Sequence, residues 1–523
     1  MKRGDQIKKI KEKKHYDILV IGGGATGLGI AVDAAARGLS VLLAEQDDFA
    51  KATSSRSTKL VHGGVRYLAQ GDLKLVIHAL HERGRMRQNV PHLVNDMRFI
   101  IGNYRWWEKP FYSIGLTIYD ILAGHLGLGR SLPLSRKKVM QEIPALKQNK
   151  LRGGVVYHDG QFDDARMAIT LALTAVDHGA VCINYMKAVN LLKSPDGTIC
   201  GAMLHDQLTD VTYTITAEAV INATGVFVDE IMEMVMPEEK KKVCPSQGVH
   251  LVVNSKFLGG ESALMIPKTK DGRVLFGVPW HGKVVLGTTD TPLNETSPEP
   301  KALDEEIEFI LEQAGEYLEI KPTRKDVLSV YAGLRPLAAP DKPADNKKTK
   351  EISRSHKIYK SSCKRLITIT GGKWTTYREM AEDAVNMAVI NAKLQCKPCC
   401  TKYLKQHGYM ENVDRSGWEY VYGSDIEHIR QLIREDSSNA EILHEKYAFT
   451  KAHVVWSVRE EMALTVEDVL SRRIRLLILD ARVAIEIAPE VAAIMAAEMG
   501  ENEEWIGTQV SAFRELAKNY VLG

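Results

Sequence analysis

The 523-residue sequence lacks a long apolar run. A helix that crosses a bilayer needs roughly 18 consecutive apolar residues. Asp120 and His125 interrupt one candidate segment. The other candidate is interrupted by Asp480, Arg482 and Glu486. The sequence therefore predicts a protein that does not span a membrane.

Cysteine is also scarce, with seven residues in the whole chain. An odd number, without a secretory apolar segment near the N-terminus, is typical of a reducing cytoplasm, so we expect no structural disulfides. The tightest group, Cys396, Cys399 and Cys400, resembles half of a metal site. No second CxxC or paired histidine motif lies near it, so we predict no bound metal.

The chain carries little net charge, because 69 Lys and Arg residues oppose 66 Asp and Glu residues, which leaves +3. This balance argues neither for nor against nucleic acid, and we predict no nucleic-acid partner. The 26% charged and 45% hydrophobic residues are typical of a globular protein. The length predicts two or three domains of about 150 residues each.

Residues 16–45 have the pattern of a complete dinucleotide-binding unit. An apolar run, 17–21, enters a GxGxxG motif whose glycines are Gly22, Gly24 and Gly27. An Ala-rich helical stretch and a second apolar strand, 41–44, follow, and that strand ends in Glu45. In such a unit the glycines allow a tight turn, close approach of the backbone to a pyrophosphate, and close helix packing, while the acid binds a ribose hydroxyl. The sequence therefore predicts a nucleotide cofactor.

The rest of the chain favours FAD over a nicotinamide cofactor. No second GxGxxG provides a separate nicotinamide domain. A hydroxyl-rich loop at 53–67, an Ala-Thr-Gly after a late strand and a Gly-Gly-Lys before a helix indicate a long ligand held by distant segments. The predicted cofactor contacts are Gly22, Gly24, Gly27, Glu45, Thr53, Ser54, Ser57, Lys59, His62, Gly63, Gly64, Ala223, Thr224, Gly225, Gly371, Gly372 and Lys373.

The patterning predicts an α/β fold with additional helices. It comprises a Rossmann-type FAD-binding domain, an antiparallel β-rich substrate domain and a C-terminal α-helical domain. A β-rich run with turn signals at 243–331 indicates the second domain, and helix-like sequence beyond Pro398 the third. The predicted ranges are 14–94, 151–242 and 355–394 for the FAD-binding domain, 95–150 and 243–354 for the substrate domain, and 395–523 for the helical domain.

The motifs together resemble those of the FAD-dependent glycerol-3-phosphate dehydrogenase family. They read GGGATGLGIAVDAAARG, SSRSTKLVHGGVRYL, INATG, YAGLRPL, SRSH and GGKWTTYREMAEDA, and the likeness extends over most of the chain. The resemblance implies oxidation of sn-glycerol 3-phosphate to dihydroxyacetone phosphate, with electrons passed from reduced FAD to a membrane quinone. It also implies a homodimer that associates peripherally with the cytoplasmic face of the inner membrane.

The substrate phosphate requires a cationic anchor, and the matching motifs supply candidates. Arg66, Arg335 and Lys373 lie in three of these motifs, and Arg354 is a fourth candidate. Guanidinium groups suit phosphate because they offer paired donors. With Tyr67 as part of the pocket wall, these residues are the predicted substrate contacts.

The predicted catalytic residues are His250, Arg335 and Lys373. His250 matches a histidine of the family's substrate pocket, and a neutral imidazole is suited to take the proton of the C2 hydroxyl. His62 is expected beside the isoalloxazine ring. Lys373 precedes a helix, so its charge and the helix N-terminus are expected to stabilise negative charge on the flavin.

Three alternatives share part of this pattern. An oxygen-reducing glycerol-3-phosphate oxidase would use the same residues and differ only in its electron acceptor. A related amine or 2-hydroxy acid oxidase would need a carboxylate clamp instead of surplus phosphate-binding cations. A non-catalytic flavin-binding scaffold would not need Arg66, His250, Arg335 and Lys373 together.

Two segments are candidates for contact with a membrane surface. Residues 1–14 carry seven Lys or Arg residues against two acids, and Trp106 and Trp107 begin an aromatic-rich stretch that continues to Leu128. The alternative is a solvated tail and a buried aromatic cluster. The sequence does not choose between them.

Overall fold

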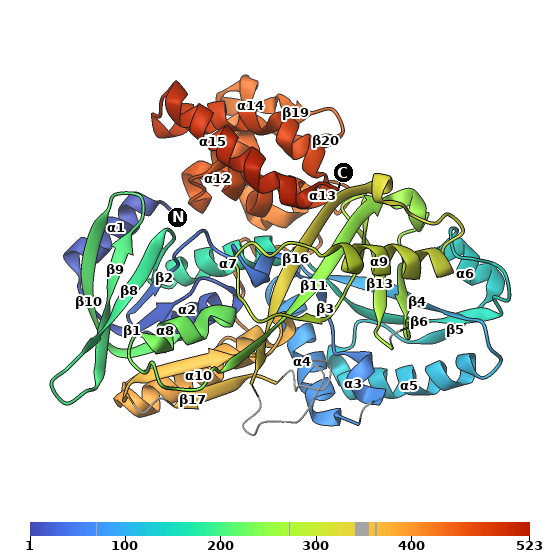
Figure 1. Ribbon diagram of the computed structural model, residues 1–523, viewed down its shortest axis with the longest axis horizontal. Helices are drawn as coiled ribbons and strands as arrows, with labels where there is room; N and C mark the ends of the chain where they lie inside the picture. Colours follow the sequence, from blue (N-terminus) through green and yellow to red (C-terminus); the bar gives the residue numbers. More distant parts are fainter. Residues whose placement is uncertain (70, 271, 340–354, 361–362, 523) are drawn as a thin grey trace.

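The computed structural model describes every residue of the chain except 70, 271, 340–354, 361–362 and 523. Two sheets lie side by side, and the C-terminal helices pack across one side of both (Figure 1). This arrangement confirms the predicted fold class. The division into the predicted domain ranges remains a prediction.

The first sheet contains the predicted nucleotide-binding unit. Strand β1 pairs in parallel with β2 on one side and with β10 on the other. Its residues Ile18, Leu19 and Val20 are fully buried, as expected for a parallel strand covered on both faces. The sheet has the order β17-β18-β10-β1-β2-β7, with β9 attached to β10 and β8 to β9. Its strands are β1 (His15–Ile21), β2 (Val41–Ala44), β7 (Val181–Ile183), β8 (Met186–Lys193), β9 (Ile199–Asp206), β10 (Val211–Asn222), β17 (Lys357–Lys360) and β18 (Leu366–Thr370).

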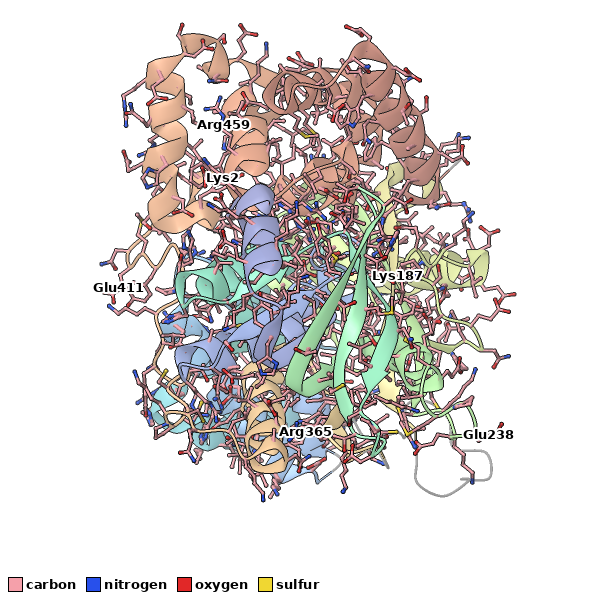
Figure 2. All side chains as sticks on the ribbon, turned by 90° about the vertical axis from the view of Figure 1, so that its left-hand side faces the viewer. Lys2, Lys187, Glu238, Arg365, Glu411 and Arg459 are labelled. Atoms are coloured by element: carbon pink, nitrogen blue, oxygen red, sulfur yellow. The ribbon has the colours of Figure 1, made fainter. Side chains whose placement is uncertain are left out.

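Helices cover this sheet, and α2 packs against both α7 and α10. These helices are α1 (Arg3–Glu12), α2 (Ala25–Ala36), α7 (Asp164–Asp177), α8 (Val228–Glu233) and α10 (Tyr377–Ala392). The basic segment 1–14 is not a solvated tail, because α1 buries Gln6 and Ile10. The Met1 ammonium group also donates to the Glu460 carbonyl oxygen at 2.8 Å. Figure 2 shows the neighbouring residues Lys2 and Arg459 at this junction with the C-terminal helices.

The second sheet is mostly antiparallel. It has the order β15-β11-β14-β13-β12-β4-β6-β3, with β16 on β11 and β5 on β6. Its strands are β3 (Leu60–Val61), β4 (Asn95–Asn103), β5 (Leu132–Ser135), β6 (Gly153–Gln161), β11 (Val243–Asn254), β12 (Ala263–Ile266), β13 (Leu275–Trp280), β14 (Lys283–Gly287), β15 (Thr291–Pro292) and β16 (Val327–Ala338). Strands β3 and β6 belong to this sheet, although their sequences lie in ranges assigned above to the FAD-binding domain. The β11–β16 pairing sets Ser246 opposite Arg335 and His250 opposite Tyr331.

Several helices surround the second sheet. They are α3 (Val65–Ala69), α4 (Leu73–Asn89), α5 (Glu108–Ala123), α6 (Arg136–Glu142) and α9 (Asp304–Tyr317). Helix α4 ends just before Pro91, as the sequence predicts. The aromatic stretch is only partly buried, because Trp106 is 78% exposed and Phe111 60%, whereas Tyr119 is 1% exposed. The stretch contains the whole of α5, whose helical pattern was not evident from the sequence.

The C-terminal part is mainly helical, as predicted. It contains α11 (Ile426–Glu435), α12 (Lys451–Glu461), α13 (Leu476–Leu479), α14 (Ala481–Met499) and α15 (Glu503–Ala517), a π-helical turn, η10 (Asp468–Arg473), and the hairpin strands β19 (Ile442–His444) and β20 (Tyr447–Thr450). Thr465 and Asp468 form a capping pair at the start of the turn, since Asp468 N–H donates to Thr465 Oγ1 and Asp468 Oδ2 accepts from Thr465 N–H. Short 3₁₀ turns that bear on the site are η1 (Thr53–Ser55) and η7 (Trp374–Thr376). Among the helices of the described residues, none combines the length and apolar character needed to cross a bilayer.

A buried histidine in α12 should make the stability depend on pH. Burial lowers the pKa of His453 to about 4, so below pH 6.5 the unfolded chain binds a proton at this residue that the folded chain does not. We therefore expect His453 to lower the free energy of unfolding by about 2 kcal/mol between pH 7 and pH 5. His453→Gln keeps an acceptor for the Thr450 N–H, which donates to His453 Nδ1, and removes the titration. Urea unfolding at both pH values should give a smaller difference in the free energy of unfolding for this variant than for the wild type. An unchanged difference would contradict the assignment.

Candidate active site

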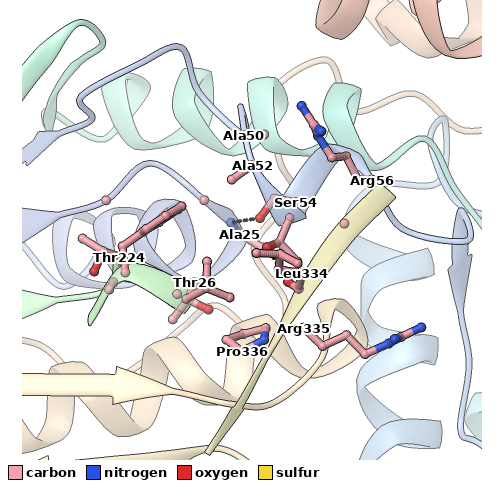
Figure 3. A pocket seen from close by; sticks show the side chains of 18 of the residues that line it. Ala25, Thr26, Ala50, Ala52, Ser54, Arg56, Thr224, Leu334, Arg335 and Pro336 are labelled. Atoms are coloured by element: carbon pink, nitrogen blue, oxygen red, sulfur yellow. Dashed lines mark hydrogen bonds between the residues drawn. The ribbon is translucent and has the colours of Figure 1, made fainter. Parts of the chain in front are cut away.

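An elongated cavity of about 330 Å³ runs along the β1–α2 turn and on toward the second sheet. Its walls come from both sheets and from the loop at residues 46–58. Figure 3 shows Thr26, Ser54 and Thr224 around the start of α2, while the Arg335 side chain points away from that turn. The cavity is therefore long enough to join a phosphate-binding turn to a cationic end.

The N-terminus of α2 has the geometry that a pyrophosphate requires. Gly22 has φ +109°, and a Cβ there would lie 2.8 Å from the Ala223 carbonyl oxygen. A Cβ on Gly27 would lie 1.9 Å from the Gly22 carbonyl oxygen, so the helix packs against the turn without room for a side chain. The Ala25 N–H donates to Ser54 Oγ at 2.9 Å (Figure 3). The first amides of a 12-residue helix thus point at the cavity wall, as in other dinucleotide sites.

Glu45 is held in the position expected of a ribose-binding acid. Its carboxylate accepts from the Gly23 N–H at 2.5 Å and from the Asp47 N–H at 2.9 Å. Burial raises the pKa of Glu45 to about 7, while these two donors act in the opposite direction. The glycine turn, the helix N-terminus and this oriented acid together fit the adenosine diphosphate half of FAD.

Most of the predicted cofactor contacts line the cavity. They are Gly22, Gly24, Glu45, Thr53, Ser54, Ser57, His62, Ala223, Thr224, Gly225, Gly371, Gly372 and Lys373. Gly27 lies beneath the turn, Gly63 lies behind the wall, and Gly64 lines a neighbouring cavity. Lys59 does not reach the cavity, because its ammonium group is fully buried and pairs with Asp164 at 2.7 Å.

A second cavity of about 170 Å³ adjoins the first. Five residues line both cavities: Thr58, Leu60, His62, Tyr67 and Arg335. Further aromatic and polar side chains enclose it: Phe99, Tyr157, Asp159, Arg273, Phe276, Thr288 and Asp290. Lys373 Nζ lies 4.2 Å from the Tyr67 ring centroid, so its charge stands where the two cavities meet. The second cavity therefore has room for a small anionic substrate beside a ligand in the first.

Arg335, on β16, is oriented by backbone and side-chain acceptors. Its guanidinium donates to the Gln247 carbonyl oxygen at 3.1 Å and to the Thr289 carbonyl oxygen at 2.9 Å. It also donates to Thr288 Oγ1 at 3.0 Å and lies 3.4 Å from Asp290 Oδ1. These contacts fix the side chain, which remains one-fifth exposed and lines both cavities.

His250, on β11, is held between a hydroxyl and an aromatic ring. Its Nε2 lies 2.9 Å from Thr58 Oγ1, and its ring stacks on Tyr331 with centroids 4.9 Å apart. Burial, reinforced by the charges of Lys59 and Arg335, holds the pKa of His250 well below its ordinary 6.5. The imidazole is therefore neutral and able to accept a proton.

Arg66 and Arg354 are the remaining predicted substrate residues. Arg354 and the side chain of Arg66 lie outside the described residues, and only the backbone of Arg66 is placed, in α3. Two contacts of His250 were not predicted: Thr58 lies inside the hydroxyl-rich loop but was not singled out, and Tyr331 is visible only through the β11–β16 register.

All seven cysteines are free thiols, and the Cys399 thiol donates to Asp33 Oδ1.

The helix N-terminus fits a pyrophosphate, and the cavity beside it runs on to Arg335, Lys373 and the neutral imidazole of His250. This arrangement is that of a flavin-dependent oxidoreductase. The family model described as FAD dependent oxidoreductase matches residues 17–378, and that of the C-terminal domain of alpha-glycerophosphate oxidase matches residues 364–505. The mitochondrial glycerol-3-phosphate dehydrogenase of Schizosaccharomyces pombe is 36% identical over 581 residues, which cover 99% of this chain and 89% of that protein. The human mitochondrial enzyme of the same name is 39% identical, over 95% of this chain and 72% of its own.

A solved structure agrees with these matches. The glycerol-3-phosphate dehydrogenase of Bacillus halodurans, complexed with FAD, superposes with a TM-score of 0.80 at 30% identity and covers 99% of this chain and 98% of that one. The chain belongs to the FAD-dependent glycerol-3-phosphate dehydrogenase family. Membership confirms the predicted cofactor, FAD. The L-α-glycerophosphate oxidase of Mycoplasma pneumoniae, at 16% identity and a TM-score of 0.58, shares the fold.

Proposed function

We propose that the protein oxidises sn-glycerol 3-phosphate to dihydroxyacetone phosphate. The observation that carries this proposal is the junction of the two cavities, where Arg335 lines both cavities and acts electrostatically on the neutral His250, and Lys373 lies over the Tyr67 ring. The second cavity, of about 170 Å³, suits a three-carbon phosphate ester. The named relatives support the same substrate. When bound, FAD supplies the acceptor for the hydride that leaves C2.

The protein's own residues would bind the phosphate and remove the hydroxyl proton. Arg335 and Lys373 bind the dianionic phosphate, together with Arg66 and Arg354 as predicted from the motifs. His250 Nε2 lies 2.9 Å from Thr58 Oγ1, so the Thr58 hydroxyl passes its proton to this nitrogen and takes the proton of the C2 hydroxyl in exchange. Burial is the largest cause of the lowered pKa of His250, and the charges of Lys59 and Arg335 add to it. The phosphate dianion offsets these charges, so substrate binding makes this residue a better base.

Other oxidases of the same fold class are less well supported. An amine or 2-hydroxy acid oxidase needs only a group that binds the substrate carboxylate. This pocket instead offers several cations from separate motifs. A non-catalytic scaffold has no use for a buried, oriented histidine at the flavin end. The relatives favour dehydrogenation over reduction of oxygen, and we infer that the electron acceptor is a quinone.

A substrate panel tests the proposal directly. The purified yellow protein is mixed anaerobically with sn-glycerol 3-phosphate, glycerol, lactate or sarcosine, and the visible flavin absorbance is followed. We expect rapid bleaching with sn-glycerol 3-phosphate only. Faster bleaching by lactate or sarcosine would replace the substrate assignment, and no bleaching by any of them would favour the scaffold.

The structure offers a surface for peripheral membrane contact, which a quinone acceptor requires. One face of α5 is apolar and exposed, with Phe111 60%, Ile114 65%, Ile118 43% and Ile121 72% exposed. Trp106 and Trp107 extend this surface at the start of the helix. Exposed apolar faces of this kind insert into the boundary of a bilayer. The homodimer and the cytoplasmic side of the inner membrane remain predictions from the resemblance.

Replacing apolar residues on this face should weaken membrane binding without harming the enzyme in solution. Phe111→Ser with Ile114→Ser removes two exposed side chains, so we expect at least tenfold weaker binding to phospholipid vesicles in a flotation assay. Ile390→Ser is the matched control, because Ile390 is 72% exposed on α10. Equal vesicle binding by the double variant and by Ile390→Ser would show that the membrane contact lies elsewhere on the protein.

A further inference from the structure

We propose that Tyr119 is a positioning residue for the turn His62–Gly63–Gly64 beside the flavin, and that it makes helix α5 a structural part of the active-site wall. The inference rests on the proposed function only in that this turn borders the reacting end of the site. It assigns a role to the buried side of the helix whose outer side is the exposed apolar surface.

Helix α5 has two distinct faces. The exposed apolar residues recur at positions 111, 114, 118 and 121. The buried residues Leu116, Tyr119 and Ala123 follow at helical spacing on another face, each 1% exposed. They pack into the cluster that also holds Leu80, Phe99 and Tyr157. The buried face of α5 therefore packs into the cluster that supplies Phe99 and Tyr157 to the aromatic lining of the second cavity.

The Tyr119 hydroxyl connects this face to the turn. It accepts from the Gly63 N–H at 2.8 Å and donates to the Asp159 carboxylate, with both oxygens at 3.0 Å. Asp159, on β6, also pairs with Arg83 at 2.5 Å. Burial raises the pKa of Tyr119 well above its ordinary 10, so the phenol keeps the proton that it donates to Asp159.

The turn packs closely on the residues around this contact. A Cβ on Gly63 would lie 2.6 Å from both the Tyr119 hydroxyl and a Leu80 methyl carbon, so the backbone of the turn packs directly on these side chains. From the other side, Thr375 Oγ1 accepts from the His62 N–H at 3.2 Å. Thr375 follows Lys373 by two residues and lines the FAD cavity.

The turn is thus held between two hydroxyls, Tyr119 from helix α5 and Thr375 from the segment that carries Lys373. His62 lines both cavities and Gly64 lines the second. Any shift of the turn would move the wall against which flavin and substrate are packed. Displacements of about 1 Å in such walls cost large factors in rate.

Tyr119→Phe removes one oxygen atom and keeps the packing of the ring. The Gly63 N–H then has only Asp159 Oδ1, at 3.4 Å, in place of the phenol. We expect the dissociation constant of FAD to rise and the rate of flavin reduction to fall, each about tenfold, with a shifted visible flavin spectrum. The Michaelis constant for substrate should change less than the turnover number.

The matched control is Tyr447→Phe. Tyr447 is buried in the C-terminal part and donates to Asp480 Oδ2 at 3.0 Å, so the variant loses a similar tyrosine–aspartate hydrogen bond and touches neither cavity. Both variants should lower the melting temperature by similar amounts, but only Tyr119→Phe should change FAD affinity and the flavin spectrum. Wild-type FAD affinity and spectrum in Tyr119→Phe would overturn the proposal.

The proposed substrate can fail without affecting this test. FAD affinity, measured by flavin fluorescence, and the visible spectrum need no substrate. If sn-glycerol 3-phosphate bleaches neither wild type nor variant, the proposed function is wrong while the comparison of FAD binding still decides the role of Tyr119. Phe111→Ser with Ile114→Ser should leave both properties unchanged in solution, which would assign the effect to the buried face alone.

Discussion

Replacement of Lys373 by alanine is expected to slow flavin reduction by about 10²–10³-fold while FAD stays bound. Lys373 stands at the junction of the two cavities, 4.2 Å from the Tyr67 ring centroid, and immediately precedes η7 and α10. The positive charge of Lys373 and the backbone N–H groups of the following turns would stabilise the negative charge that develops at the flavin as it is reduced. The proposed phosphate contact would be lost as well, so the Michaelis constant should also rise.

Anaerobic stopped-flow absorbance with saturating substrate measures this effect. Lys393→Ala is the control, because Lys393 is exposed at the opposite end of α10. Lys373→Arg should recover part of the rate, since it restores the charge with a different shape. A fully active Lys373→Ala protein would refute the assignment.

Removal of the Asp48 carboxylate is expected to lower the free energy of unfolding by about 3–5 kcal/mol, the usual cost of breaking a buried ion pair from one side. Asp48 is fully buried and accepts from Arg472 Nε at 2.6 Å and from Arg473 at 2.7 and 2.9 Å. Burial alone would raise the pKa of Asp48, but the two guanidinium groups outweigh it and hold the pKa well below its ordinary value. Asp48→Ala would leave both arginines buried without this partner.

The same variant should weaken FAD binding, because Asp47, Ala50 and Lys51 on either side of Asp48 line the FAD cavity. The C-terminal turn η10 therefore fixes the loop that follows the ribose-binding acid. Urea unfolding and FAD titration check both effects. Glu419→Ala is the control, since it breaks an exposed pair with Arg430 and should change stability by less than about 1 kcal/mol. An Asp48→Ala protein as stable as this control would contradict the account.

The features that the sequence predicted well are those with local signals. The strand, glycines, helix and terminal acid of residues 16–45 lie next to one another, and each has a distinct composition. The end of α4 was predictable because Pro91 cannot continue a helix. The β-rich second sheet was predictable from its turn residues and alternation, although not the inclusion of β3 and β6, which come from distant parts of the chain.

The features that escaped prediction depend on long-range pairing. Asp48 and Arg473 are 425 residues apart, and nothing near either one marks the partner. Lys59 was predicted as a cofactor contact from its position in the hydroxyl-rich loop. Its ammonium group instead pairs with Asp164 beneath the loop. Helix α5 was missed because its two apolar faces blur the usual alternation of apolar and polar residues, one face being buried and the other exposed.

The central claim is that this FAD protein takes a hydride from sn-glycerol 3-phosphate and passes the electrons to a quinone. The most direct test is anaerobic stopped-flow absorbance with sn-glycerol 3-phosphate, followed by mixing of the bleached protein with a quinone analogue or with oxygen. The account predicts fast bleaching, fast reoxidation by the quinone analogue and slow reoxidation by oxygen. Fast reoxidation by oxygen would make the protein an oxidase, and absence of bleaching would contradict the substrate assignment.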